Sequence, residues 1–248
     1  MNERRRPSDR SKQPARRDER RGSRPHPMGD KRKPARYEPV HLSDEIVKEL
    51  KLMARPGKGE ILVKVFADAA SAYAAGDMAE AIKLADQAKH IALRSPTIRE
   101  LLGLAYYHSG RYKEAASELT AFRRLSGTTE QNPVIADCYR ALGKPEKAIE
   151  ICDQIEFKKV DPAVVFEGEI VAAGALDDMG RLEESIARLE RLNLRPPVAE
   201  EHHLRAWYAL ANLLEKHGRF SQAREWFEGV AAGDPELTDA AERLKRLR

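Results

Sequence analysis

Residues 207–235 read WYALANLLEKHGRFSQAREWFEGVAAGDP, and this stretch decides the fold. Gly218 separates two segments in which apolar residues recur every three or four positions, the spacing of one helical face. These residues are Leu210, Ala211 and Leu214 before the glycine, and Ala223, Phe227 and Val230 after it. Glycine adopts the left-handed conformation that ends a helix without steric cost. The stretch therefore predicts two helices joined by a glycine turn.

The same punctuation recurs along the chain. Turn glycines stand at Gly76, Gly110, Gly143, Gly180 and Gly218, at intervals of 34, 33, 37 and 38 residues. In every unit the fifth residue after the glycine is Ala or Ser, and the ninth and twelfth residues are apolar or small. Together with 35 Ala in 248 residues, which favour helix, this period predicts an all-α array of similar units.

Four proline pairs mark expected helix beginnings. They are Ser95-Pro96, Asn132-Pro133, Asp161-Pro162 and Asp234-Pro235. The first residue of each pair can cap a helix with its side-chain oxygen, and proline is tolerated at the first helical position because no backbone donor is needed there. We expect each pair to begin a helix.

The repeat resembles the tetratricopeptide repeat family of 34-residue helix-turn-helix units. Residues 207–235 carry the resemblance best, followed by the second unit with Leu102, Gly103, Tyr106, Gly110, Tyr112, Ala115 and Leu119. The third unit departs from the pattern, because Pro145 replaces the aromatic residue after the turn, and the fourth has Leu176 where Tyr is usual. The resemblance implies a right-handed α-solenoid of about five units, near residues 62–95, 96–131, 132–160, 161–198 and 199–235.

The two ends of the array need cover. Amphipathic segments at residues 43–55 and 235–247 are predicted to form capping helices, because end repeats expose an apolar face. We divide the chain into a tail, residues 1–40, and a helical repeat domain, residues 41–248.

The tail differs sharply in charge from the rest. Residues 1–37 carry +9 and the remaining residues −5, and the first 37 contain no Val, Ile, Leu, Phe, Trp or Cys. Such a segment cannot bury enough apolar surface to offset the entropy of ordering, so a disordered basic tail is predicted. Its cations could neutralise RNA or DNA phosphates or an acidic protein. The candidate polyanion-binding residues are Arg4, Arg5, Arg6, Arg16, Arg17, Arg20, Arg21, Lys31, Arg32 and Lys33. A solubilising tail, or one that folds back onto the acidic body, is the alternative.

No residue pattern indicates catalysis, a cofactor or a metal. Pro56–Glu60 lacks the spacing of a phosphate loop. His202 and His203 are adjacent and should point about 100° apart on a helix, so they are expected to be solvated or capping. Cys138 and Cys152 are expected to pack as small buried hydrophobes. The sequence therefore predicts a protein that is not an enzyme.

Targeting patterns are also missing from the sequence. The charged N-terminal stretch has no apolar segment behind it, and the longest apolar run is far shorter than the roughly 20 residues of a membrane span. A cytoplasmic protein without a membrane span is expected.

The resemblance implies a concave groove lined by the first helices. The candidate partner-binding residues, taken at fixed offsets before the turn glycines, are Phe66, Tyr73, Leu104, Tyr107, Asp137, Arg140, Tyr208 and Asn212. We expect a peptide or helix of a protein partner to bind there, with Tyr73 and Tyr107 as anchors and Asn212 pairing with peptide backbone. The tyrosines could instead simply pack between neighbouring units. The alternative function is a nucleic-acid- or ribosome-associated factor tethered through the basic tail.

Overall fold

A computed structural model of the chain describes residues 37–247. All ten candidate cations of the tail, and the predicted disorder of residues 1–36, lie outside the described residues. Within residues 37–247 every regular element is an α-helix, so the all-α prediction is confirmed.

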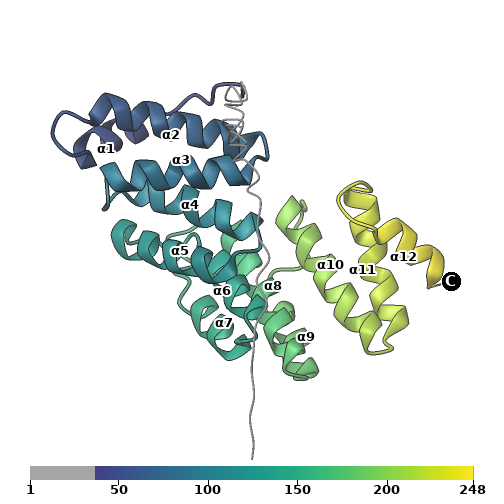
Figure 1. Ribbon diagram of the computed structural model, residues 1–248. Helices are drawn as coiled ribbons and strands as arrows, with labels where there is room; N and C mark the ends of the chain where they lie inside the picture. The colour runs from purple at the N-terminus through teal and green to yellow at the C-terminus, as the bar shows by residue number, and fades with distance from the viewer. Residues whose placement is uncertain (1–36, 248) are drawn as a thin grey trace, which may run out of the picture. The chain divides into compact units, whose positions relative to one another are not determined.

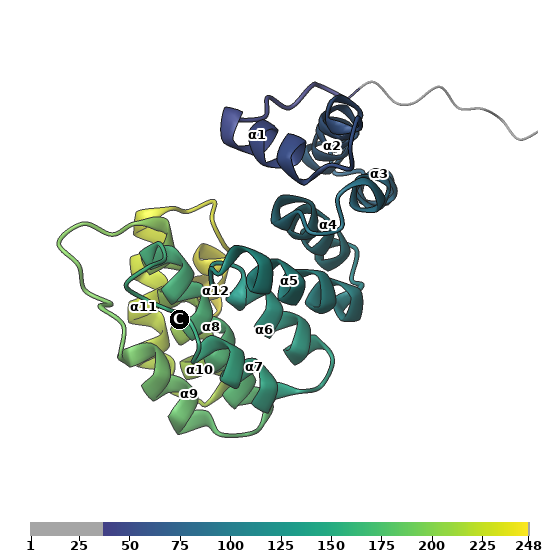
Figure 2. The same ribbon diagram turned by 90° about the vertical axis from the view of Figure 1, so that its left-hand side faces the viewer.

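The helices form consecutive pairs, and the two helices of each pair run antiparallel and are joined by a short turn (Figure 1). The five pairs, here called units 1 to 5, are α2 (Gly59–Ala74) with α3 (Met78–Ile91), α4 (Pro96–His108) with α5 (Tyr112–Ser126), α6 (Asn132–Ala141) with α7 (Pro145–Cys152), α8 (Pro162–Asp178) with α9 (Leu182–Glu190), and α10 (Glu201–Lys216) with α11 (Phe220–Gly233). Helix α1 (Asp44–Met53) precedes them and α12 (Ala240–Arg246) follows them. Each unit packs against the next along the chain (Figure 2).

The predicted turn glycines all adopt the left-handed conformation. Their φ angles lie between 68° at Gly143 and 80° at Gly76. In the first turn the backbone N–H of Asp77 donates to the carbonyl of Ala72 at 2.9 Å, which closes the helix end by a bond that spans the glycine. A residue with a Cβ would be strained at these sites. The backbone geometry of each turn therefore favours glycine there.

The predicted apolar stripe forms the core. The fifth and ninth residues after every turn glycine are at most 3% exposed, from Ala81 and Ala85 in unit 1 to Ala223 and Phe227 in unit 5. The twelfth residue is buried in units 1, 2 and 5. In units 3 and 4 the second helix ends too early, at Cys152 and Glu190, to include it.

Two of the four predicted helix caps are wrong. Ser95 and Asp161 cap α4 and α8 as expected. Asn132 instead lies inside α6, fully buried, and its Nδ2 donates to the carbonyl of Ile151 at 2.9 Å, which ties α6 to the end of α7. Asp234 begins a turn in which its Oδ1 accepts from the backbone N–H of Glu236 at 2.9 Å. The C-terminal capping helix therefore spans only Ala240–Arg246, shorter than the predicted 235–247.

The N-terminal boundary of the helical part also differs from residue 41. Tyr37 packs beside Ala72 and Ala81, and its hydroxyl donates to Asp77 Oδ2 at 2.8 Å. The backbone N–H of Val40 donates to Ser71 Oγ at 3.0 Å. Residues 37–40 are thus bonded to unit 1, ahead of the predicted capping helix α1.

Of the two roles expected for His202 and His203, solvated or capping, the solvated one is wrong. Both side chains are buried, 9% and 7% exposed, because the start of α10 is covered by Phe166 of α8. Their ring centroids lie only 4.1 Å apart. His203 does cap its helix, since its Nδ1 accepts from the backbone N–H of Glu200 at 3.1 Å.

Gly103 allows the two helices of unit 2 to approach closely. A Cβ added there would lie 2.6 Å from Leu119 Cγ. We expect Gly103→Ala to lower stability by about 1–2 kcal/mol, because overpacking outweighs the better helix propensity of alanine. Urea unfolding followed by circular dichroism measures this. The matched control is Gly59→Ala, whose added Cβ would meet Lys51 at an ordinary 3.5 Å. An equal or higher urea midpoint for Gly103→Ala contradicts the packing argument.

The buried histidine pair makes stability sensitive to acid. Burial, and then the neighbouring His202, lower the pKa of His203 below its ordinary 6.5, while the Glu200 carboxylate near His202 opposes this. Above pH 6.5 both folded and unfolded states hold a neutral His203; below it the unfolded state binds the proton more readily, so stability falls as pH falls. The urea midpoint of the wild type should therefore drop more between pH 7.5 and 5 than that of His203→Gln. Equal drops in the two proteins would refute this.

Candidate protein-binding face

The first helices present one continuous partly exposed stripe. It consists of the residues three and six positions before each turn glycine, and we call it the first-helix face. Its members are Ala70, Tyr73, Leu104, Tyr107, Asp137, Arg140, Gly174, Asp177, Asn212 and Glu215, all of them partly exposed. The residue seven positions before each glycine, for example Ala136 in unit 3, is buried against the neighbouring helices. The residue seven positions before each glycine thus belongs to the core, and its neighbour six positions before belongs to this face.

Aromatic side chains gather at the N-terminal half of the face. The ring centroids of Tyr73 and His108 lie 5.8 Å apart, those of His108 and Tyr107 5.4 Å, and those of Tyr107 and Tyr112 6.0 Å. We call these four residues the aromatic cluster. It connects α2, α4 and the start of α5, so it spans units 1 and 2. The edge and tilted arrangements are those that aromatic pairs favour.

Tyr107 is fixed in place by a bond to the next unit. Its hydroxyl donates to Asp137 Oδ2 of α6 at 2.7 Å. Burial, with this bond and the charge of Asp137, raises the pKa of Tyr107 far above its ordinary value of 10.0. The phenol therefore stays protonated and keeps donating throughout the physiological pH range.

Similar contacts join every unit to the next one. The residue three positions before the turn glycine meets the following unit in each case: Tyr73 meets His108, Tyr107 meets Asp137, Arg140 Nε donates to Asp178 Oδ2 at 2.5 Å, and Lys216 Nζ donates to Asp177 Oδ2 at 2.7 Å. In unit 5, Glu215 accepts from Arg243 Nε of α12 at 2.9 Å. We call this series the cross-unit ladder.

Gly174 makes room for one rung of the ladder. A Cβ added to Gly174 of α8 would lie 2.9 Å from Arg140 Cζ, so the missing side chain lets the guanidinium lie against the helix. Arg140 also lies 3.5 Å from Asp137 on its own helix. Units 3 and 4 are thus joined through an arginine between two carboxylates.

The remaining predicted groove residues have different surroundings. Phe66 is only 4% exposed and packs in the core with Leu50 and Leu62, so its assignment to an open groove is wrong. Leu104 packs partly against the unit 3 core. Tyr208 places its ring 5.8 Å from that of Phe227 and donates its hydroxyl to Asp239 Oδ1 at 2.5 Å. Asn212 Oδ1 is buried and has no hydrogen-bond partner among the described residues.

Sequence patterns missed four residues of this face and its surroundings: His108, Tyr112, Asp178 and Lys216. Three of these lie two positions before a turn glycine and meet the residue three positions before the glycine of the preceding unit. This paired offset is the signal that could have revealed them.

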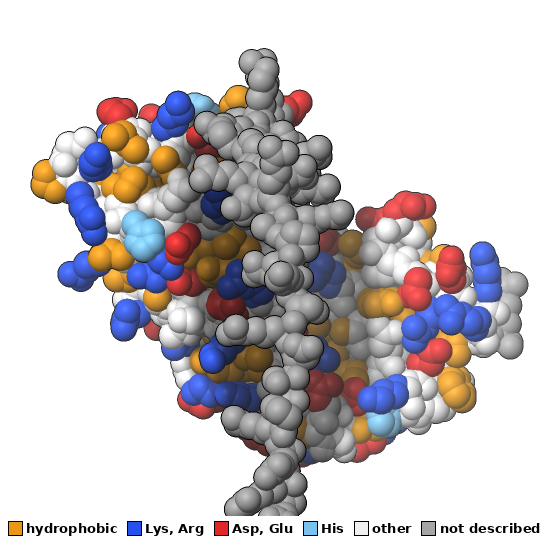
Figure 3. Space-filling view, in the orientation of Figure 1, with side chains coloured by type: hydrophobic (Ala, Val, Ile, Leu, Met, Phe, Trp, Pro, Cys, Tyr) orange, Lys and Arg blue, Asp and Glu red, His pale blue; other side chains and the backbone are white. Residues whose placement is uncertain are grey.

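Charge is dispersed over the visible surface of the helical part. Figure 3 shows acidic and basic side chains interspersed, with hydrophobic side chains between them. Many of the charged groups are paired, as in the ladder. On the surface visible in Figure 3, a partner that relied on a single sign of charge would find little to bind.

The cysteines have the expected surroundings. Cys138 and Cys152 are both buried, and burial raises the pKa of each thiol to about 12. Within residues 37–247 no cluster of three or more His, Cys, Asp or Glu side chains is arranged to hold a metal ion. The helices of this part include none whose length and hydropathy would suit a membrane span.

Comparison with known proteins identifies the repeat. The family model described as tetratricopeptide repeat matches residues 66–127 and 171–238, leaving out unit 3, the unit with the shortest pair of helices. Among curated proteins, none matches this chain.

Solved structures share the fold at low sequence identity. A thermophilic repeat protein of Thermus thermophilus is 18% identical, with a TM-score of 0.57 over 75% of this chain and 98% of its own. The repeats of a putative kinesin light chain of Podosopora anserina are 19% identical, with a TM-score of 0.54 over 73% and 97%. The type IV pilus biogenesis factor PilW is 13% identical, with a TM-score of 0.61 over 75% and 86%. These likenesses concern the fold alone.

Proposed function

This chain belongs to the tetratricopeptide repeat family, and we propose that its first-helix face binds an extended or helical segment of a partner protein without performing chemistry on it. Arrays of this family generally serve as protein–protein interaction scaffolds. The observation that carries the proposal is the aromatic cluster of Tyr73, Tyr107, His108 and Tyr112, which is partly exposed and continuous across two units.

The cluster has the properties of an interface anchor. Tyrosine supplies a large contact area with few rotatable bonds, and binding hot spots are rich in it. Tyr107 is already held by Asp137, so binding would cost little further side-chain entropy. The Tyr73 ring is partly exposed beside His108, so part of its surface is available to a peptide.

The C-terminal half of the face would contribute less charge than its residue types suggest. Arg140 and Asp177 are engaged in the ladder, so their charges are largely compensated within the protein. Asn212 is the proposed contact for peptide backbone in this half, because rotation of its amide toward a bound peptide would satisfy its unpaired Oδ1. We therefore propose an apolar or aromatic partner segment, anchored at units 1 and 2.

The basic tail supports a second candidate function. Its +9 over 37 residues would give salt-sensitive, sequence-tolerant binding to nucleic acid, as in a ribosome-associated factor. In the scaffold proposal the same tail adds avidity to partner binding. The two differ in whether the tail or the first-helix face is indispensable.

Affinity capture from the native cell with four forms tests the proposal. They are the full chain, residues 37–248, Tyr73→Ala, and Phe157→Ala as a control at an aromatic residue that is 66% exposed outside the face. We expect Tyr73→Ala to retain at least tenfold less of a protein that the other three forms retain, since it loses a hot-spot side chain. Matching thermal unfolding curves ensure that folding is intact.

Two results would contradict it. If Tyr73→Ala retains the same proteins as the full chain, the aromatic cluster is not the anchor. If nuclease treatment and removal of residues 1–36 each abolish all retention at low salt, the nucleic-acid function holds instead.

A further inference from the structure

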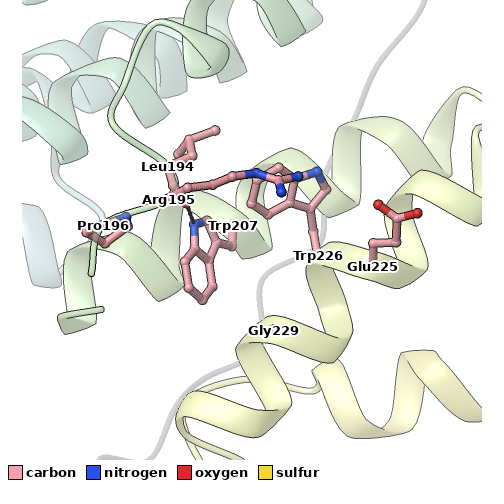
Figure 4. A pocket seen from close by; sticks show the side chains of 7 residues that line it. All are labelled: Leu194, Arg195, Pro196, Trp207, Glu225, Trp226 and Gly229. Carbon is pink, nitrogen blue, oxygen red and sulfur yellow. Dashed lines mark hydrogen bonds between the residues drawn. The ribbon is translucent and has the colours of Figure 1, made fainter. Parts of the chain in front are cut away.

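A recess lies where unit 4 meets unit 5. It encloses about 360 Å³ between the segment 191–200, which joins α9 to α10, and helix α11 (Figure 4). Both tryptophans of the chain, Trp207 and Trp226, line it. We call it the tryptophan pocket. It contains no residue of the first-helix face.

The pocket lies beside the irregular segment that follows α9. The eighth residue after a turn glycine contacts the preceding second helix or the segment just after it: Glu118 of unit 2 accepts from Lys89 of α3, and Arg188 of unit 4 donates to Asp153 after α7. In unit 5 this residue is Trp226. Helices α7 and α9 have only 8 and 9 residues, and after α9 the irregular segment 191–200 lies beside Trp226.

The walls of the pocket are fixed. Trp207 donates its indole N–H to the carbonyl of Leu194 at 2.8 Å. Its ring lies against Gly229 of α11, where an added Cβ would come within 3.3 Å of Trp207 Cε3. The two indole centroids are 6.1 Å apart with planes inclined at 43°, and the guanidinium of Arg195 lies 5.6 Å from the centre of the Trp226 ring. Figure 4 shows Arg195 extending over Trp226 from the joining segment.

The charges of the pocket favour an uncharged occupant. Arg195 and Glu225, which carry opposite charges, both line it. A cationic ligand would meet Arg195, which already covers the face of Trp226, and an anionic ligand would meet Glu225. A ligand of either charge would therefore meet a residue of the same charge in the pocket.

The polar groups of the pocket favour carbonyl oxygens. Trp226 and Arg195 line the pocket with donor groups, because an indole N–H and a guanidinium both donate hydrogen bonds and accept none. An extended polyproline II segment has no internal hydrogen bonds and therefore presents its carbonyls, while its rings pack on aromatic side chains at low entropic cost. The volume is that of a small binding site.

From these observations we infer that the tryptophan pocket binds a proline-containing segment of a partner protein in the polyproline II conformation. The proline rings pack on the indole surface that Arg195 and Gly229 leave uncovered, and Trp226 and Arg195 donate to backbone carbonyls. This site is separate from the first-helix face, so one array would hold two segments.

Tryptophan fluorescence tests the inference directly, because both tryptophans of the chain report on the pocket. The probes are a blocked decamer of proline and a blocked decamer of alternating Gly and Ser. We expect a saturable change in emission with the proline decamer alone. Trp226→Ala, followed through Trp207, should weaken this response at least tenfold, and Trp226→Phe, which keeps a ring without the N–H, severalfold.

The control variant is Phe220→Ala, an exposed aromatic residue at the start of α11, which should bind as the wild type does. Circular dichroism confirms that each variant is helical. The inference is overturned by an unchanged emission with the proline decamer, by an equal response to the Gly-Ser decamer, by a stronger response to Glu-rich or Lys-rich decamers, or by wild-type binding in Trp226→Phe.

Discussion

The fold depends on burial that no unit can achieve alone. Leu119, on the second helix of unit 2, is fully buried in a cluster with Ile135 and Ala136 of unit 3, and that cluster extends to Ala172 of unit 4. Each large apolar side chain buried in this way contributes about 1.5–3 kcal/mol relative to an exposed one. Stability is therefore shared between neighbours, as in other repeat arrays, and the helices α1 and α12 cover the faces left at the two ends.

The same constraint builds the candidate site. Packing each first helix on its neighbour brings the residues three and two positions before successive turn glycines together, and these positions hold the ladder of Tyr73 with His108, Arg140 with Asp178, and Asp177 with Lys216. The side chains that a partner would meet are therefore partly organised before it binds. Where the ladder is ionic, its charges are paired within the protein. Where it is aromatic, the ring surfaces remain available to a partner.

The sequence was sufficient to predict those features that depend on a single local rule. Glycine turns and the apolar stripe follow from the left-handed backbone of residues such as Gly218 and from helical periodicity. It was insufficient where residues far apart in the sequence determine the surroundings of a side chain. Asn132 could cap a helix by its local sequence, but it is buried and donates to the carbonyl of Ile151 instead. Phe66 stands at the offset of a groove residue but lies in the core. The partners in the ladder are 28 to 39 residues apart, and the tryptophan pocket depends on the irregular segment 191–200, which carries no periodic signal.

Hydrogen exchange of the Arg140→Ala variant tests most directly whether the ladder couples units. Arg140 is on α6 and its partner Asp178 ends α8, so loss of the guanidinium should speed amide exchange in both α6 and the C-terminal half of α8, with α2 and α3 unchanged. Mass spectrometry of peptides from each helix measures this. Faster exchange confined to α6, or no change in either helix, would contradict the view that the first-helix face is held together across units.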